Sequence, residues 1–127
     1  MMAPGWITAL VRDFGRAAGL SDFTLNERGV AAVSFENGLS LRFEFAGEAL
    51  TVAVTAPVLL DPAQARTLLA YAHPDARFGL RVRTGYLAGR GRAVFAIRLD
   101  EREATLPVVN RAFDVLWHVA QEFGGQR

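Results

Sequence analysis

The chemistry available to this chain is limited by the few side chains that can transfer protons or attack a substrate. Two histidines and no cysteines occur in 127 residues, which removes thiolate nucleophiles and cysteine-based zinc or iron–sulfur sites. His73 precedes Pro74 at an expected helix end, and His118 follows Trp117 in the expected last helix. Neither histidine belongs to an HExxH motif or has a third ligand at metal spacing, so we expect no metal site.

The serines and clustered carboxylates do not form a recognisable catalytic pattern. Ser21, Ser34 and Ser40 lie near a turn or within expected strands, without a GxSxG elbow or an evident histidine partner. The acids at 100–103 stand just before the last expected helix, where they compensate the helix dipole. We therefore expect no catalytic residues, no cofactor and no enzymatic activity.

One glycine-rich stretch, from Gly85 to Arg92, could hold a phosphate group, because it offers close backbone approach and positive charge. It lacks the Walker lysine and does not lead into a helix, so a connection between two strands is the competing interpretation. The arginines of this part of the chain are Arg77, Arg81, Arg83, Arg90 and Arg92. An anionic partner bound by the arginine-rich hairpin 81–92 is therefore our alternative function.

Composition indicates a folded protein of one domain, residues 1–127. Hydrophobic residues make up 51% and charged residues 21%, which lies in the range of globular proteins. The formal net charge is +1, and arginines alternate with acids along most of the chain, which disfavours a nucleic-acid partner. No apolar stretch approaches the roughly 18 residues of a membrane span. No signal peptide is recognisable, so we expect a cytoplasmic location and no membrane partner.

Three helices are expected from apolar spacing and end signals. Apolar residues at three- and four-residue intervals predict an amphipathic helix from Pro4 to Ala18. The sequence Asp61-Pro62-Ala63-Gln64 is a strong helix start and predicts a short helix that stops at His73. A wider apolar stripe predicts a last helix from about Thr105 to Phe123.

Six strands are expected between these helices. Four precede the second helix, and their ranges are Phe23 to Glu27, Val30 to Phe35, Leu39 to Phe45 and Leu50 to Thr55. Two follow it, at 78–82 and at 93–99. The fold class is therefore α+β, a curved antiparallel sheet with helices packed against it, in the order α-β-β-β-β-α-β-β-α.

The turn at Glu36-Asn37-Gly38 sets the register of the second and third expected strands. A two-residue loop would mix apolar and polar side chains on each face, whereas a three-residue loop with Gly38 in the left-handed conformation separates them. The resulting pairs are Phe35–Leu39, Val33–Leu41 and Ala31–Phe43. The opposite face then carries Ala32, Ser34, Ser40, Arg42, Glu44, Thr51 and Ala53.

Several of these segments resemble a known family. They are Leu10-Val-Arg-Asp-Phe14-Gly15-Arg-Ala-Ala-Gly19-Leu20, Leu25-Asn26-Glu27-Arg-Gly29, Val33-Ser-Phe35-Glu-Asn-Gly38, and the strand Ala93 to Leu99 with the long helix after it. The chain is similar over nearly its whole length to the class I chaperones of bacterial type III secretion, the Tir-chaperone or CesT-like group. This resemblance implies a cytoplasmic homodimer, linked to virulence, that binds an N-terminal segment of a secreted effector, keeps it export-competent and hydrolyses no ATP.

The resemblance also implies two surfaces, each with a competing structural interpretation. The expected effector-binding residues are Ile7, Val11, Ala32, Ser34, Arg42 and Ala53, which otherwise belong to a solvated or helix-covered sheet face or to a helix. The expected dimer-interface residues are Leu68, Leu69, Tyr71, Phe78, Leu80 and Val82, which otherwise pack in the core. The pI of about 8.4 differs from the acidic pI usual in this family. It leaves open a heterodimer with a related chaperone that serves a secretion-gate protein, and a chaperone-like fold outside secretion.

Overall fold

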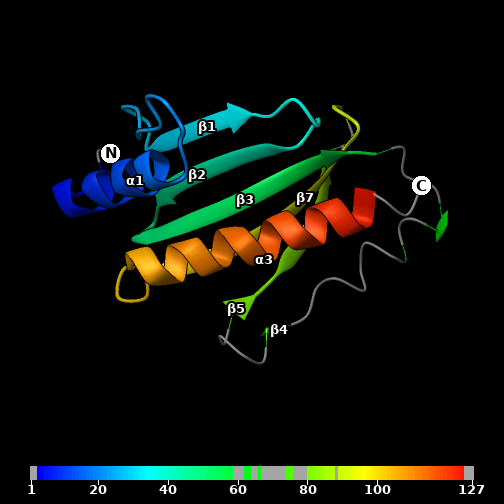
Figure 1. The fold of residues 1–127 in the computed structure, drawn as a ribbon. Coiled ribbons are helices and arrows are strands. Elements are labelled where there is room, and N and C mark those ends of the chain that lie inside the picture. The colour runs from blue at the N-terminus through cyan, green and yellow to red at the C-terminus, as the bar shows by residue number, and fades with distance from the viewer. Residues whose placement is uncertain are drawn as a thin grey trace.

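The computed structural model describes residues 3–58, 62–63, 66, 74–75, 80–87 and 89–124. In these residues the chain forms two long helices and a five-stranded antiparallel sheet in the order β1-β2-β3-β7-β6 (Figure 1). The helices are α1 (Gly5–Ala17) and α3 (Leu106–Gly124). The strands of the sheet are β1 (Val30–Ser34), β2 (Ser40–Ala46), β3 (Ala49–Pro57), β6 (Arg83–Leu87) and β7 (Arg92–Asp100). A separate two-stranded sheet consists of β4 (Pro74–Asp75) and β5 (Leu80–Arg81).

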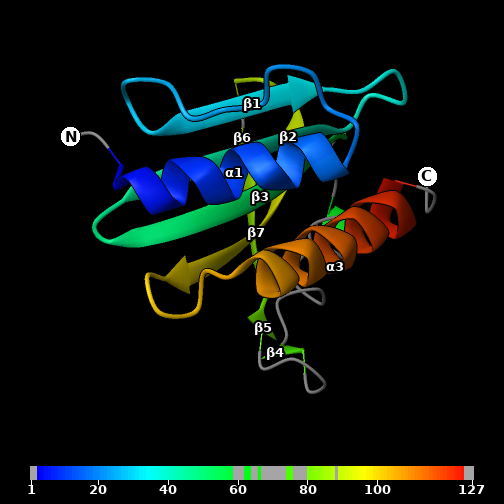
Figure 2. The same ribbon diagram turned by 60° about the vertical axis from the view of Figure 1, so that its left-hand side comes forward.

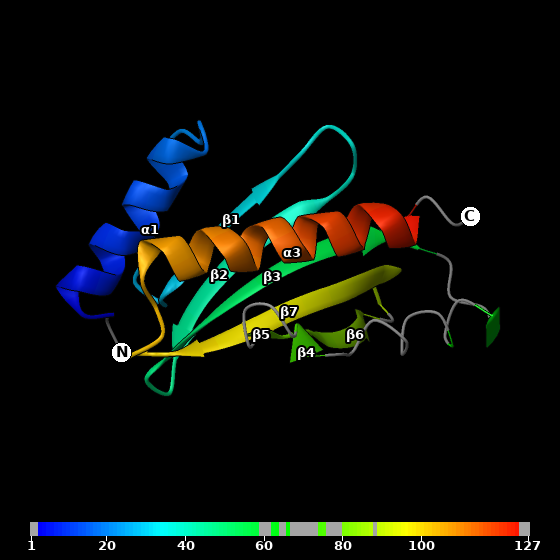
Figure 3. The ribbon, with the colours of Figure 1, turned by 60° about the horizontal axis from the view of Figure 1, so that its bottom comes forward.

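Both helices cover the same face of the sheet (Figures 2 and 3). Helix α3 packs along β3 and β7, and α1 contacts the first part of α3. Phenylalanine rings fill the space between these layers, and the ring of Phe14 lies 4.9 Å from that of Phe43 and 5.4 Å from that of Phe113. The core of the described chain therefore lies between the two helices and one face of the sheet, as the α+β expectation required.

The structure confirms the register predicted from the turn at 36–38. Strands β1 and β2 pair Ala31 with Phe43 and Val33 with Leu41, and the Phe35 amide donates a 2.9 Å hydrogen bond to the Leu39 carbonyl. Gly38 has a φ of 89°, the left-handed conformation that the three-residue loop needs.

The stretch expected as the first strand, Phe23 to Glu27, does not form one. The side-chain Oδ1 of Asn26 accepts the backbone amides of Arg28 at 2.8 Å and of Val30 at 3.1 Å. This Asx turn reverses the chain, and the Asn26 amide donates to the Val30 carbonyl at 2.8 Å. A local side-chain hydrogen bond thus replaces the strand ladder that the apolar pattern predicted.

The strand expected at 78–82 is not part of the five-stranded sheet. Its residues Leu80 and Arg81 form β5 in the two-stranded sheet, and the strand that pairs with β7 is β6. Residues Gly85 to Leu87 belong to β6 and pair with β7, and the connection is only residues 88–91. The Arg90 amide closes this turn with a 3.0 Å hydrogen bond to the Leu87 carbonyl. The expected second helix lies outside the described residues, except that 62, 63 and 66 are helical.

Candidate site on the open face of the sheet

Small side chains dominate the sheet face opposite the helices, which we call the open face. One row across it runs through Ala32, Arg42, Ala53, Ala96 and Arg83, each paired with the next. The expected residues Ala32, Arg42 and Ala53 therefore lie side by side on three neighbouring strands. Ala32 and Arg42 are exposed, whereas Ala53 retains only 9% of its accessible surface because it lies in the middle of the sheet.

At the β1 side of the open face the chain forms a hollow of about 380 Å³, which we call the arginine hollow. Three arginines, Arg42, Arg90 and Arg92, line it together with the small residues Ala32, Ser34, Ser40 and Thr55. These residues come from β1, β2, β3 and the β6–β7 hairpin. Three expected effector-binding residues thus share one cavity with two arginines of the hairpin, on which the alternative function depends.

Arg92 fixes the shape of the hollow. Its Nε donates to Thr55 Oγ1 at 2.7 Å, and its Nη2 donates to the Gly38 carbonyl at 2.6 Å and to the Thr55 carbonyl at 3.2 Å. The hydroxyls of Ser40 and Thr55 are 2.5 Å apart. Arg92 therefore joins β7 to the β1–β2 turn across β3, and its guanidinium is already committed to protein acceptors.

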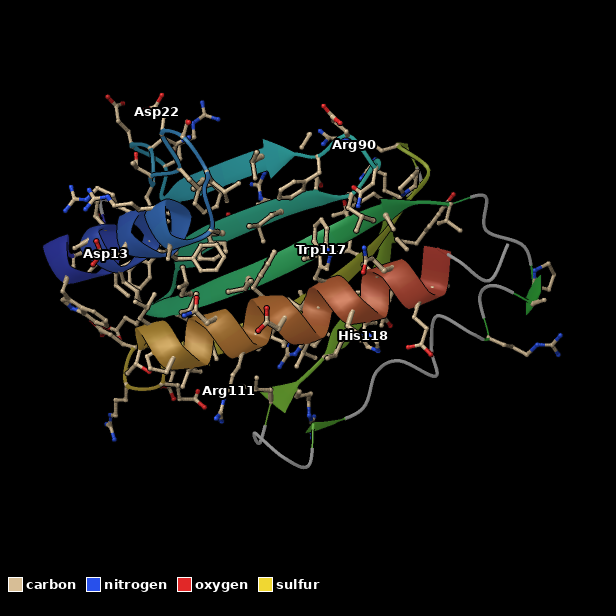
Figure 4. All side chains as sticks on the ribbon, in the orientation of Figure 1. Asp13, Asp22, Arg90, Arg111, Trp117 and His118 are labelled. Atoms are coloured by element: carbon tan, nitrogen blue, oxygen red, sulfur yellow. The ribbon has the colours of Figure 1, made fainter. Side chains whose placement is uncertain are left out.

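The other two guanidinium groups of the hollow remain open to a ligand. Arg42 Nη2 lies 3.8 Å from Glu44 Oε1, and both side chains are about half exposed, at 51% and 47%, so this pair is weak. Arg90 is exposed at the hairpin tip beside the β1–β2 turn (Figure 4), and its side chain makes no hydrogen bond or ion pair with any described residue. The hollow therefore presents uncompensated positive charge.

β1 is an edge strand, and part of its backbone faces away from the sheet. The Gly29 carbonyl accepts the amide of Phe45 on β2 at 2.8 Å, and the Phe35 amide donates to the carbonyl of Leu39, the residue before β2, at 2.9 Å. Residues two apart in an antiparallel strand face the same way. The amides and carbonyls of Ala32 and Ser34 consequently point outward. At Val30 the same edge is closed by Asn26, so the free edge is short and lies directly beside the arginine hollow.

The helix side of this edge carries partly buried aromatic residues that sequence reasoning did not single out. Phe35 packs edge-on against Trp117 at 4.9 Å, and Trp117 lies 5.5 Å from Phe113. Figure 4 shows Trp117 on the sheet side of α3, with His118 on the other side of the helix. We call Phe35, Phe113 and Trp117 the aromatic shelf. Its only signal in the sequence was the four-residue spacing between Phe113, in the apolar stripe of α3, and Trp117.

Two of the expected effector-binding residues are not on the surface. Ile7 and Val11 have no accessible surface and belong to the core beneath α1. The apolar stripe of an amphipathic helix faces the interior first, so these side chains hold α1 on the sheet. A partner could not touch them without displacing that helix.

The expected dimer-interface residues fall into two groups. Leu80 and Val82 are each 4% exposed and pack in the core of the same chain. Leu68, Leu69, Tyr71 and Phe78 lie outside the described residues. Of the remaining hairpin arginines, Arg83 is exposed on the open face at its opposite edge.

The acid cluster before α3 has a structural role, and the histidine that the structure describes is exposed. Asp100 Oδ1 accepts the amides of Arg102 and Glu103, both at 3.0 Å, so this acid shapes the turn before α3 rather than a catalytic pair. His118 is 80% exposed and lies 3.8 Å from Glu122, and His73 lies outside the described residues. Within those residues no three histidines or carboxylates approach one another closely enough to bind a metal.

The described helices are also too short or too polar to cross a membrane.

Comparison with solved structures supports the fold. The ExsC–ExsE complex contains a chain with a TM-score of 0.79 and 19% identity, covering 98% of this chain and 95% of that one. The HopA1–SchA chaperone–effector complex gives 0.73 and 19%, covering 94% of both chains.

A third similar structure is the Yersinia pestis type III secretion chaperone SycH with a fragment of YscM2, with a TM-score of 0.66, 15% identity, and 91% and 98% of the two chains covered. A search by sequence among curated proteins finds no significant match. Residues 6–124, however, match the family described as type III secretory system chaperone SycN. Because this match spans almost the whole chain, the protein belongs to the SycN family of type III secretion chaperones.

Proposed function

We propose that this secretion chaperone binds an extended segment of a secreted effector by pairing it with the free edge of β1, and that it keeps that segment export-competent. The proposal includes no catalysis and a cytoplasmic location, where an effector waits before export. It is supported by family membership and by similarity to a chain from a chaperone–effector complex. The observation that carries it is the outward-facing backbone of Ala32 and Ser34.

The residues beside the free edge of β1 are compatible with a paired strand on both faces of the sheet. A bound strand would lie about 4.8 Å from β1 and direct alternate side chains to opposite faces of the sheet. On the open face its side chains would meet Ala32 and Ser34, which leave room. On the helix face they would meet Val33 and Phe35, next to Trp117. An extended segment with apolar residues at alternate positions therefore matches the residue types on both faces of this edge.

A proline substitution tests this pairing directly. In Ala32→Pro, one outward-facing amide is lost and a ring occupies the edge, while the ladder to β2 keeps its hydrogen bonds, because proline is tolerated where an edge amide faces solvent. Ala32→Thr is the matched control, since it adds similar bulk but keeps the amide.

We expect the wild-type chain and Ala32→Thr, but not Ala32→Pro, to retain a secreted polypeptide from bacterial lysate under conditions of secretion. Mass spectrometry would identify the bound protein, and urea denaturation would establish that both variants fold. Equal recovery of the same polypeptide with Ala32→Pro would contradict the proposed site.

Dimer formation is a second part of the proposal, and it rests on family membership alone. The chain would form a homodimer, or a heterodimer with a related chaperone, through Leu68, Leu69, Tyr71 and Phe78. Light scattering on the purified chain would give twice the mass of one chain, 13.8 kDa, for a homodimer. Replacement of Tyr71 by aspartate should then halve the measured mass. If the purified wild-type chain has the mass of a monomer, the homodimer is excluded and only a heterodimer with a related chaperone remains.

A further inference from the structure

We infer that the bound segment carries an acidic side chain, aspartate or glutamate, on the side of its strand that faces the open face of the sheet, and that Arg42 and Arg90 bind this carboxylate. This inference rests on the proposed function and adds a sequence preference to it. The chaperone would then select segments in which an acid alternates with apolar residues.

The charge balance of the hollow supports an acid as the occupant. Of the three arginines that line it, Arg92 already donates to Thr55 and Gly38, while Arg90 has no partner among the described residues. Arg42 has only the loose contact of 3.8 Å with Glu44. Guanidinium groups bind carboxylates through paired, charge-assisted hydrogen bonds, and the hollow is lined by no acid.

The position of the hollow limits the occupant to a side chain of the paired strand. The free amides of Ala32 and Ser34 lie on β1, and the side chains of the same two residues line the hollow. A strand paired here therefore directs every second side chain into it. Because Ala32 and Ser34 are small, a longer acidic side chain can pass over them and reach the arginines.

A peptide accounts for these features better than a nucleic acid does. A nucleic-acid site usually combines a long basic track with exposed aromatic stacking surfaces. Here the positive charge is confined to one hollow in a chain of net charge +1, and the aromatic shelf lies on the other face of the sheet from the arginines. The outward-facing amides and carbonyls at the edge also match the hydrogen-bonding groups of a peptide strand. A phosphate backbone has no donors for the carbonyls.

Selection from a displayed random dodecapeptide library tests the preference without knowledge of the natural effector. The wild-type chain serves as bait, and selected peptides are synthesised with a fluorescent label for binding measurements by anisotropy. The test variant is Arg42→Gln/Arg90→Gln. Its matched control is Arg83→Gln, which removes an exposed arginine from the same row of the same face, three strand spacings or roughly 14 Å from Arg42. All variants are first compared by urea denaturation.

We expect selected peptides to carry aspartate or glutamate between apolar residues. Their affinity should fall about tenfold for the double variant and less than about twofold for Arg83→Gln, since the lost contacts are charge-assisted. Replacing the peptide acid by its amide should produce the same loss in the wild type and no further loss in the double variant, because the two changes remove one interaction.

The outcomes separate this inference from the proposed function. Peptides that bind without acids, or with equal affinity to the double variant, would overturn the inference, and their loss of binding to Ala32→Pro would still support strand pairing. Peptides that bind Ala32→Pro as well as wild type, or a library that gives no binder, would contradict the proposed function itself. Binding of a labelled single-stranded DNA that is abolished in the double variant would make the hollow a nucleic-acid site and overturn the inference.

Discussion

Arg92 and Gly38 are separated by 54 positions in the chain, yet the Arg92 guanidinium donates a 2.6 Å hydrogen bond to the Gly38 carbonyl. The bond joins the start of β7 to the turn between β1 and β2. A second bond from the same side chain reaches Thr55 on β3, the strand between them. One arginine therefore holds three segments of the sheet in the arrangement that forms the arginine hollow.

Replacement of Arg92 should destabilise the fold as well as the site. Arg92→Ala removes several charge-assisted hydrogen bonds, and we expect a loss of about 2 kcal/mol in the free energy of unfolding. Arg92→Lys should recover little of it, since an ammonium group cannot donate in the directions that the planar guanidinium serves. Urea denaturation would measure both losses. Arg90→Ala is the control, with an expected change below about 0.5 kcal/mol, and an equal loss there would contradict the assignment.

Gly15 is required for close packing and not for chain flexibility. It lies within α1, and a Cβ at this position would stand 2.7 Å from the Cβ of Phe23, so Gly15→Ala should cost about 1–3 kcal/mol despite the better helix propensity of alanine. Gly5→Ala is the matched control, because a Cβ there meets nothing within 4 Å. We expect that control to be neutral or stabilising in thermal unfolding. Stabilisation by both substitutions would refute the packing explanation.

In the turn before α3, Asp100 makes more backbone hydrogen bonds than the other acids of its cluster. Asp100 accepts two backbone amides, and its own amide donates to Glu103 Oε1 at 3.1 Å. Asp100→Ala should therefore lower stability by about 1 kcal/mol. Glu101→Ala, in the same turn, should change stability by less than about 0.5 kcal/mol. Chemical denaturation of the two variants would show the difference, and equal effects would mean that charge alone matters.

Trp117 should contribute to binding more than an exposed tryptophan elsewhere does. It packs on Phe35 beside the free edge, so Trp117→Ala should weaken the binding of a paired segment by about tenfold, as anchor aromatics do. Trp6 is 46% exposed near the start of α1, an end of the helix that Figures 1 and 2 show far from the end of β1, so Trp6→Ala should leave affinity unchanged. The measurement is anisotropy with the peptides selected above. Comparable losses in both variants would place the bound segment over α1 instead.

Local patterns in the sequence predicted the parts of the fold that depend on neighbouring residues. The turn at 36–38 gave the β1–β2 register because only one loop length puts Val33 and Leu41 on the same face. The strand expected at 23–27 failed for an equally local reason, the Asx turn of Asn26, which an apolar pattern does not reveal.

Local sequence patterns predicted only part of the candidate site. Alternation placed Ala32, Ser34 and Arg42 on the open face, and the structure brings all three to one hollow. The pairing of β3 with β7 decides where Arg90 and Arg92 lie, and nothing local in the sequence specifies which strands become neighbours. For Ile7 and Val11 the family resemblance implied a binding patch, whereas their apolar spacing on the helix was the signature of core packing.

Residue-resolved amide hydrogen exchange on the chain with and without a bound effector segment tests strand pairing at β1 most directly. The amides of Ala32 and Ser34 should exchange quickly in the free chain and become strongly protected in the complex, while Val33, already bonded to β2, should change little. Unchanged fast exchange at Ala32 and Ser34 in a saturated complex would contradict the account.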